Sequence, residues 1–254
     1  MPIIIKSQTI YGAPSIVTDG LSLYLDAANT RSYPGTGIIW NDLSGNGNNG
    51  TLINGPTFDS GNNGSIVLDG VNDYTNTTFL TKNHFIENQN WTVSSWHNVI
   101  SNTTSGNGRG GISVNQKYQS EVDPGGFGIN IANGNYCVNL THEIQGGTKS
   151  SYELLSPVPI NYNTIEHIIA TYENTSKTVR IYKNGILTNS STNSNYKWTP
   201  ATGNTRYNVI GTSTQGGWGY YFPMKIYNSL IYNRALTAEE ILQNYNSIKS
   251  RFGI

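Results

Sequence analysis

The sequence predicts an all-β protein in which two antiparallel sheets form a sandwich and one helix follows near the C-terminus. Alternating apolar and polar residues recur in short runs separated by Gly and Asn, which is the pattern of strands and turns. Charged residues make up only 12% of the chain, but its 17 Tyr, 5 Trp and 6 Phe are too many aromatic residues for a disordered protein. One segment near the end has the apolar periodicity of an amphipathic helix.

The alternation predicts where the strands lie. In the first strand, Leu21, Leu23 and Leu25 fall on one face and the residues between them on the other. In a later strand, residues 91–99, two Trp and two Val are interleaved with smaller polar residues. Further strands are expected at residues 65–69, 126–131, 136–141, 165–173, 177–182, 207–212 and 225–233.

The strongest turn signal is Asn184-Gly185. This dipeptide adopts the positive φ angles of a type I′ turn, whose twist matches that of the flanking strands. We therefore expect residues 179–182 and 186–188 to pair as a β-hairpin.

The helix has both a start signal and an apolar face. Thr237 followed by Glu240 fits a capping box, in which each residue satisfies a backbone N–H group of the other. Ile241, Tyr245 and Ile248 fall on one stripe of the helix. We expect this stripe to cover an edge of the sandwich.

The domain organisation is predicted to be simple. No linker or change of composition divides the chain, so residues 18–254 are interpreted as one domain. Residues 1–17 are interpreted as an extended N-terminal arm, because Pro2 and Pro14 favour extended backbone.

The charge and hydropathy patterns exclude several classes of protein. Fifteen basic and fifteen acidic residues give no net charge, whereas nucleic-acid binding needs a positive patch. No run approaches the ~18 apolar residues of a membrane span, so no membrane insertion is expected. Cys137 is the single cysteine, so the chain forms no internal disulfide. The N-terminus lacks the basic and apolar regions of a signal peptide.

Several motifs resemble those of the laminin G-like, concanavalin A-like lectin/glucanase jelly-roll family, in the expected order, over roughly residues 18–252. They are Gly20–Asp26, Trp40–Leu52, the Asp-Gly-x-x-Asp-Tyr segment at 68–74, residues 90–96, Ile181–Gly185 and Ile226–Ile241. The resemblance implies a two-sheet jelly roll, often with a structural calcium. Family members are mostly sugar-binding modules, parts of secreted enzymes, or structural proteins of bacteriophages, and the last type is the one suspected for this chain.

Catalytic signatures are missing from the sequence. Glycoside hydrolysis needs two carboxylates held across the sugar. The glucanases that the chain resembles carry alternating acids on one strand, and no such string occurs here. The adjacent pair Glu239-Glu240 opens the predicted helix. The four His residues show no recognisable spacing with Cys137, which is interpreted as a small buried residue. We therefore predict a protein that is not an enzyme, with a glycoside hydrolase as the less favoured reading.

Two loops are candidate calcium sites. Polar residues alternate in the glycine-rich loop before Ile53 as the first ligands of a calcium loop do, although Ile53 stands where a bidentate acid is expected. The alternative is a tight turn in which Asn and Gly serve only conformation. The family-like segment offers a second pair of acids, to which Asp26 is a possible addition. The predicted ligands are Asp42, Ser44, Asn46, Asn48, Asp69 and Asp73.

Aromatic residues are the candidates for sugar binding, because sugar rings stack an apolar face on such side chains. Trp218 lies among glycines with Tyr220 close by, and Trp198 precedes a proline-containing segment. The same residues could instead anchor a neighbouring protein chain. Trp40 and Trp91 are interpreted as core residues.

Two functions fit these observations. The first is a non-enzymatic virion protein, such as a capsid decoration or tail-fibre module, that presents a surface to a host glycan or a neighbouring subunit. It is favoured by the missing export signal and by the N-terminal arm, which suits strand addition onto another subunit. We expect a homo-oligomer. The alternative is a lectin-like carbohydrate-binding module of an extracellular or cell-surface glycan-processing system. Apart from calcium, no cofactor is expected.

Overall fold

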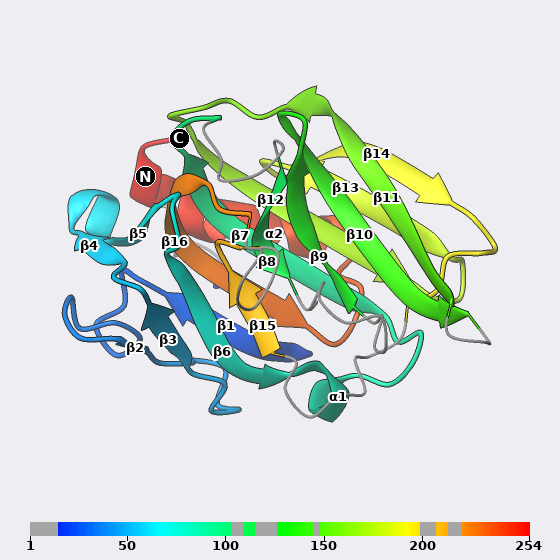
Figure 1. Ribbon diagram of the computed structural model, residues 1–254, viewed down its shortest axis with the longest axis horizontal. Helices are drawn as coiled ribbons and strands as arrows, with labels where there is room; N and C mark the ends of the chain where they lie inside the picture. Colours follow the sequence, from blue (N-terminus) through cyan, green and yellow to red (C-terminus); the bar gives the residue numbers. More distant parts are fainter. Residues whose placement is uncertain (1–14, 103–108, 115–125, 145–147, 199–206, 213–219) are drawn as a thin grey trace, which may run out of the picture.

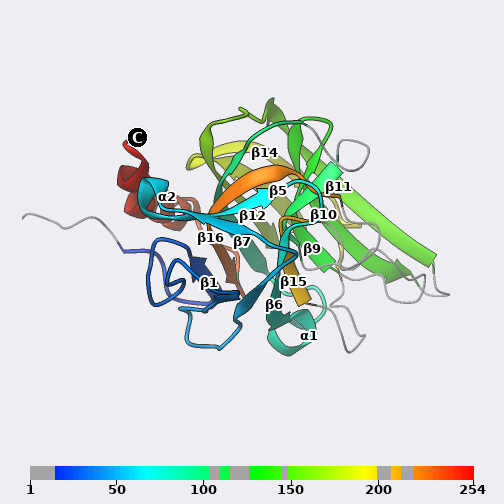
Figure 2. The same ribbon diagram turned by 60° about the vertical axis from the view of Figure 1, so that its left-hand side comes forward.

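Two antiparallel sheets lie face to face and form a jelly-roll-like sandwich, as predicted (Figures 1 and 2). The structure is a computed structural model that describes residues 15–102, 109–114, 126–144, 148–198, 207–212 and 220–254. The described helices are short: α1 (Thr81–His84), α2 (Ala238–Ile248) and the 3₁₀ turns η1 (Gly61–Asn63) and η2 (Lys249–Phe252). Among these helices none has the length and apolar character that a membrane span requires.

The first sheet contains eight described strands and lies against α2. Its order is β14-β13-β12-β7-β16-β5-β4, and β1 also pairs with β16. The bounds are β1 (Leu21–Asp26), β4 (Thr57–Asp59), β5 (Ser65–Asp69), β7 (Trp91–Val99), β12 (Ile165–Glu173), β13 (Thr178–Lys183), β14 (Ile186–Thr192) and β16 (Pro223–Tyr232).

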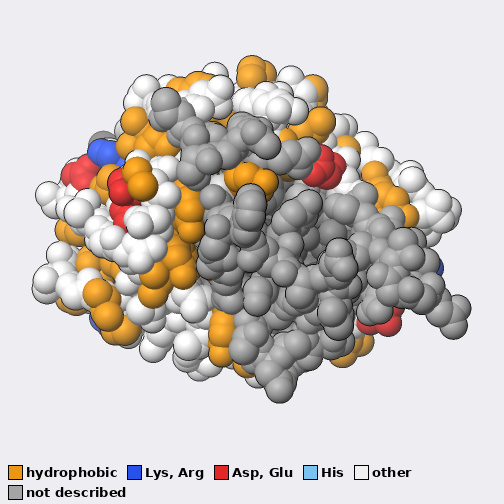
Figure 3. All heavy atoms as spheres, viewed as in Figure 1, with side chains coloured by type: hydrophobic (Ala, Val, Ile, Leu, Met, Phe, Trp, Pro, Cys, Tyr) orange, Lys and Arg blue, Asp and Glu red, His pale blue; other side chains and the backbone are white. Residues whose placement is uncertain are grey.

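The second sheet also contains eight described strands, in the order β11-β10-β9-β8-β15-β6-β3-β2. The bounds are β2 (Ile39–Trp40), β3 (Gly50–Ile53), β6 (Tyr74–Leu80), β8 (Arg109–Val114), β9 (Gly126–Ala132), β10 (Asn135–Ile144), β11 (Thr148–Pro159) and β15 (Tyr207–Ile210). Charged side chains are few among the described residues of the face seen in Figure 3.

The predicted hairpin is present. Strands β13 and β14 pair antiparallel on either side of Asn184-Gly185, whose φ angles are 53° and 80°. These positive values are the ones that the type I′ turn requires.

Aromatic rings join the two sheets at the core. Trp91 of the first sheet stacks on Phe127 of the second with 4.3 Å between ring centroids. Trp198 packs edge-on against the same phenylalanine at 4.9 Å. Trp40, like Trp91, is fully buried, which confirms the prediction that both are core residues. Cys137 is also buried, as predicted.

A β-bulge corrects the predicted faces of the first strand. The register of β1 against β16 shifts between Leu21 and Leu23. Leu23 and Leu25 point into the core between the sheets, whereas Leu21 packs with Tyr24 against a second cluster on the outer side. An extra residue in one strand reverses the alternation beyond it, so the three leucines do not share a face.

Helix α2 covers the outer face of the first sheet, not an edge as predicted. Its Ile241 is buried with Leu230 and Tyr232 of β16. Its Tyr245 stacks on Trp96 of β7 at 5.4 Å with an interplanar angle of 8°. The sheet is therefore buried on both faces over its central strands.

The capping box fixes the start of this helix, and the chain before β1 contacts its middle. The Glu240 N–H donates to Thr237 Oγ1 at 3.3 Å, and the Thr237 N–H donates to Glu240 Oε2 at 2.9 Å, as the capping-box prediction requires. The Val17 N–H donates to Asn244 Oδ1 at 2.8 Å, and Tyr232 donates to the Val17 carbonyl. Residues 15–17 of the predicted arm thus lie against α2, and the rest of the arm lies outside the described residues.

Two neighbouring residues of α2 test whether the helix is held by its buried face. Ile241→Ala should lower the free energy of unfolding by about 2–5 kcal/mol, because it removes a fully buried side chain. Leu242→Ala is the matched control, since Leu242 is 47% exposed, and should cost less than about 1 kcal/mol. Urea unfolding measures both, and equal losses would contradict the placement of the helix.

Candidate functional site

The first predicted calcium loop is organised by the carboxylate of Asp42. Oδ1 accepts hydrogen bonds from the N–H groups of Tyr24 and Ser44, both at 2.9 Å. Oδ2 accepts from Ser44 Oγ at 2.7 Å and from the Asn48 N–H at 2.9 Å. Four donors on two oxygens use the lone pairs that a calcium ion would need.

The other members of this loop tie it to β1. The side-chain amides of Asn46 and Asn48 both donate to the carbonyl of Ser22, at 3.3 and 2.9 Å. Their nitrogens therefore face the strand as donors. This arrangement is the turn that was the alternative to a metal loop.

The second predicted pair closes the loop between β5 and β6. Asp69 Oδ1 accepts from the Val71 N–H at 2.8 Å, and Asp73 Oδ2 accepts from the Asp69 N–H at 3.2 Å. Burial, together with the charge of Asp69, raises the pKa of Asp73. Within the described part of the chain, no three His, Cys, Asp or Glu residues come close enough to hold a metal. Calcium at these residues stays a prediction.

A chelator tests the calcium prediction. A site present only in the folded chain would raise the melting temperature in excess calcium relative to excess chelator. Asp42→Asn should abolish that difference if the first loop is the site, and Asp73→Asn if the second loop is. Equal melting temperatures in calcium and in chelator would contradict both.

Of the three predicted sugar-stacking residues, the structure describes Trp198 and Tyr220. Trp198 is fully buried and donates its indole N–H to the Gln89 carbonyl at 2.9 Å. It is a core residue, which corrects the prediction that it stacks on a ligand. Tyr220 is half-buried, and Trp218 lies outside the described residues.

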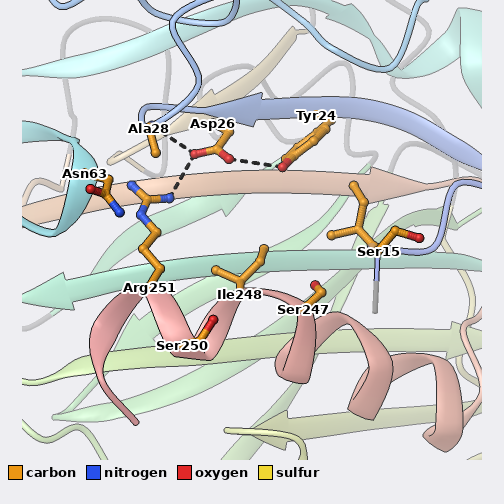
Figure 4. Close-up of a pocket in the computed structure, with 10 residues that line it drawn as sticks. Ser15, Tyr24, Asp26, Ala28, Asn63, Ser247, Ile248, Ser250 and Arg251 are labelled. Atoms are coloured by element: carbon orange, nitrogen blue, oxygen red, sulfur yellow. Dashed lines mark hydrogen bonds and ion pairs between the residues drawn. The ribbon is translucent and has the colours of Figure 1, made fainter. Parts of the chain in front are cut away.

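A pocket of about 520 Å³ lies instead between β1, the chain that precedes it, η1, and the junction of α2 with η2 (Figure 4). Its volume falls in the range of small-molecule sites. Most of its side chains are polar, unlike the mainly apolar lining of a typical drug-sized site. The lining residues are Ser15, Ile16, Tyr24, Asp26, Ala28, Asn63, Ser247, Ile248, Ser250 and Arg251.

An ion pair between Asp26 and Arg251 forms the charged part of this pocket. Asp26 Oδ1 lies 2.9 Å from a terminal nitrogen of Arg251 and accepts a second hydrogen bond from the Ala28 N–H at 3.0 Å (Figure 4). Tyr24 donates its hydroxyl to Asp26 Oδ2 at 3.1 Å. Burial, reinforced by the Asp26 charge, raises the pKa of Tyr24 far above its usual value, so the phenol stays protonated. The pocket is therefore polar without net charge.

The guanidinium of Arg251 also fixes the far wall. Its Nε donates to the Asn62 carbonyl at 2.7 Å, and a terminal nitrogen donates to the Gly64 carbonyl. The same group lies 5.5 Å from the centre of the Tyr227 ring. One side chain thus joins η2, the η1 loop and β1, and holds the pocket in a defined shape.

The sequence reasoning missed this pocket. Asp26 entered only as an addition to a calcium site, and the predicted helix was placed at an edge. The one signal for the pocket in the sequence was the carboxylate of Asp26, at the end of β1, on the side of the sheet that α2 covers. Its partner is 225 positions away, so no local pattern connects them.

The described residues offer no glycosidase pair in this pocket. Asp26 is its one carboxylate, and Arg251 holds it, whereas glycoside hydrolysis needs two carboxyl groups across the bond. His167 lies 2.8 Å from Ser94 Oγ, but both residues are buried beneath α2. A substrate cannot reach that contact.

The family of the chain follows from its similarity to known proteins. The family model of the concanavalin A-like lectin/glucanases superfamily matches residues 68–242. This chain belongs to that superfamily. The matched range is narrower than the 18–252 predicted from motifs. No curated protein matches the chain in sequence.

Solved structures share the fold at low identity. The binding domain of Paraclostridial Mosquitocidal Protein 1 matches with a TM-score of 0.67 and 18% identity, over 91% of this chain and 52% of that one. A second match is domain 4 of AbnA, an extracellular arabinanase of Geobacillus stearothermophilus, solved in complex with arabinotriose. Its TM-score is 0.64 and its identity is 18%, over 89% of this chain and 98% of that one. A Trypanosoma rangeli sialidase matches with a TM-score of 0.58 and 14% identity, over 91% of this chain and 33% of that one.

The lengths of these proteins differ. This chain spans about half of the mosquitocidal binding domain and a third of the sialidase chain, but nearly all of the arabinanase domain. The matched part is therefore a portion of a larger chain in the first two proteins and one domain of an arabinanase in the third.

Two buried histidines predict the pH dependence of stability. Desolvation lowers the pKa of His97 and of His167 to about 3, from an ordinary value of 6.5. Below pH 6.5 the unfolded chain binds protons that the folded chain does not, so stability is complete above that pH and falls as the pH decreases toward 3. Between pH 7 and pH 5, unfolding free energy should fall by about 2 kcal/mol per histidine.

Urea unfolding at the two pH values measures this loss. The window lies above the ordinary pKa of carboxylates, so Asp and Glu contribute little to it. His97→Gln should reduce the loss by about half. A free energy of unfolding that is the same at pH 7 and pH 5 would contradict the buried, neutral state of both histidines.

Proposed function

We propose that this chain is a non-catalytic carbohydrate-binding domain whose pocket at Asp26 and Arg251 receives part of a neutral oligosaccharide. The observation that carries the proposal is the lining of the pocket, which is polar, rigidly held and without net charge. Sugars need both donors and acceptors at fixed positions together with some apolar contact.

The individual side chains fit this chemistry. Ser250 and Asn63 stand at the pocket with groups that donate and accept hydrogen bonds, and the Asp26–Arg251 pair offers both kinds of partner in one fixed unit. Ile16 and Ile248 supply apolar surface for the C–H face of a sugar ring. Because the one positive charge is already neutralised, an anionic sugar gains little there, so the proposal favours neutral glycans.

The superfamily supports a binding role without deciding it. One structural neighbour that this chain matches over nearly its whole length is a domain of an arabinanase solved with arabinotriose. Another is the binding domain of a toxin. The proposed absence of catalysis is supported by the single, ion-paired carboxylate of the pocket.

A pocket-filling variant tests the proposal. Binding is measured on an array of neutral glycans that includes arabinotriose, and by calorimetry for any glycan that binds. Ser250→Trp should weaken binding by about tenfold or more, because the indole occupies the pocket while the exposed position leaves the core unchanged. Asn63→Gly should weaken it less, since glycine keeps the positive φ of 64° and removes only the amide.

The control distinguishes this pocket from the aromatic surface that the sequence suggested. Trp218→Ala and Tyr220→Ala should leave binding unchanged. Loss of binding in these two variants with full binding in Ser250→Trp would move the site to residues 218–220. Failure of the protein to bind any neutral glycan would reject the proposal.

We keep, as a finer proposal, the prediction that the domain serves as a structural or adhesive module of a virion. In that setting the pocket would contact a host-surface glycan, and the N-terminal arm would dock on a neighbouring subunit. Detection of the chain on purified particles by peptide mass spectrometry tests this location. Sedimentation of the isolated protein tests the predicted homo-oligomer.

A further inference from the structure

A charged pair is buried between the two sheets, away from the pocket. Glu166 of β12 is 1% exposed, and Lys183 at the end of β13 is 7% exposed. Lys183 Nζ lies 2.6 Å from Glu166 Oε1 and donates to the Pro159 carbonyl at 2.7 Å. Removing two charges from water costs several kcal/mol per ion, and their attraction often fails to offset it.

A carboxamide shares the same carboxylate oxygen. The loop between β11 and β12 carries Asn161, whose Nδ2 donates to Glu166 Oε1 at 2.8 Å. One oxygen therefore contacts both the amine of Lys183 and the amide nitrogen of Asn161. The other oxygen accepts from Tyr136 at 2.6 Å, and that hydroxyl contacts His97 Nε2 at 2.9 Å.

We infer that Lys183 and Asn161 become joined by an intramolecular isopeptide bond, with Glu166 as the base and acid of the reaction. The Lys183 amine attacks Cγ of Asn161 and a C–N bond forms. The bond from Cγ to Nδ2 breaks, and ammonia leaves. The Lys183 ammonium loses two protons to Glu166. One of them passes on to the departing nitrogen, and the other stays on the carboxyl group of Glu166. The net change is the loss of one ammonia, and no oxidant or cofactor is consumed.

The geometry places each group for its step. A nucleophilic amine must lose its proton to an adjacent base, and here the base touches it. The leaving nitrogen must gain a proton, and it touches the same oxygen. Contact with one shared oxygen keeps the two reacting side chains close to each other.

The second oxygen of Glu166 is held apart from this exchange. Burial, together with the charge of Glu166, raises the pKa of Tyr136 well above its usual value, so its phenol keeps its proton. The hydroxyl therefore fixes Oε2 and leaves Oε1 to serve the two nitrogens. The neutral His97 contacts the same hydroxyl group and helps to hold it in place.

Such a bond would be a covalent cross-link at one end of the sandwich. It would join the loop after β11 to the end of β13, so that the β12–β13 hairpin would lie within a covalent loop. Closing a loop restricts the unfolded chain, as a disulfide does. The chain has a single cysteine and forms no disulfide of its own.

A second lysine–asparagine contact provides an internal comparison. Lys177 Nζ donates to Asn174 Oδ1 in the turn after β12, but no carboxylate bridges that pair among the described hydrogen bonds. Both residues are half-buried. Without a base on the amine or an acid on the amide nitrogen, this pair should stay unreacted.

Intact-mass spectrometry of the purified full-length chain tests the bond. The mass should be lower than that of the sequence by one ammonia, and fragmentation should yield a branched peptide in which Asn161 is linked to Lys183. Asn161→Ala changes an exposed side chain, so it should fold and regain the full mass. Glu166→Gln should also regain it. Asn161→Asp should lose one water instead, because a carboxylic acid replaces the amide.

The matched control is Asn174→Ala, which should keep the ammonia deficit. Full sequence mass in the unaltered protein would overturn the inference. So would a deficit that survives in Asn161→Ala, because it would point to cyclisation at an Asn-Gly sequence such as Asn184-Gly185. Circular dichroism of each variant confirms folding before its mass is interpreted.

Discussion

The arrangement of the molecule depends on the burial of the first sheet on both faces. The stack of Trp96 on Tyr245 and on His167 holds α2 against the outer face. That position carries η2 and Arg251 to the end of β1, where the guanidinium meets Asp26. Without the helix on this face the pocket would lose one wall and its ion pair, so the proposed binding site is a consequence of how the sheet is covered.

The sequence predicted the fold well where one face of a strand is apolar. Strands β5 and β12 have the predicted bounds, and Trp40 and Trp91 are core residues, as predicted. It missed β6, because the inward positions Thr75 and Thr77 are polar; both are buried, and Thr77 donates to the Asn208 carbonyl. A buried hydroxyl with a partner looks, in sequence, like a surface residue.

The candidate site was less predictable for two physical reasons. The bulge that turns Leu21 to the outer side leaves no trace in the alternation, so the outer cluster could not be foreseen. The pocket joins residues 15–28, 63 and 247–251, which meet only after the sandwich has closed. The polar loop at Asp42 was visible in sequence, but its hydrogen bonds to β1 depend on register, and spacing alone could not separate a turn from a metal loop.

The ion pair at the pocket and the buried ion pair between the sheets differ in what they explain. Asp26–Arg251 has additional donors and acceptors on every side, and it fixes three segments of chain, so its structural value is evident. Glu166–Lys183 lies between the sheets, where apolar residues of similar volume would often be as stable. Stability alone therefore does not account for placing an amine, a carboxylate and an amide on one oxygen. A covalent bond does account for it, because the charges are needed only until the bond forms.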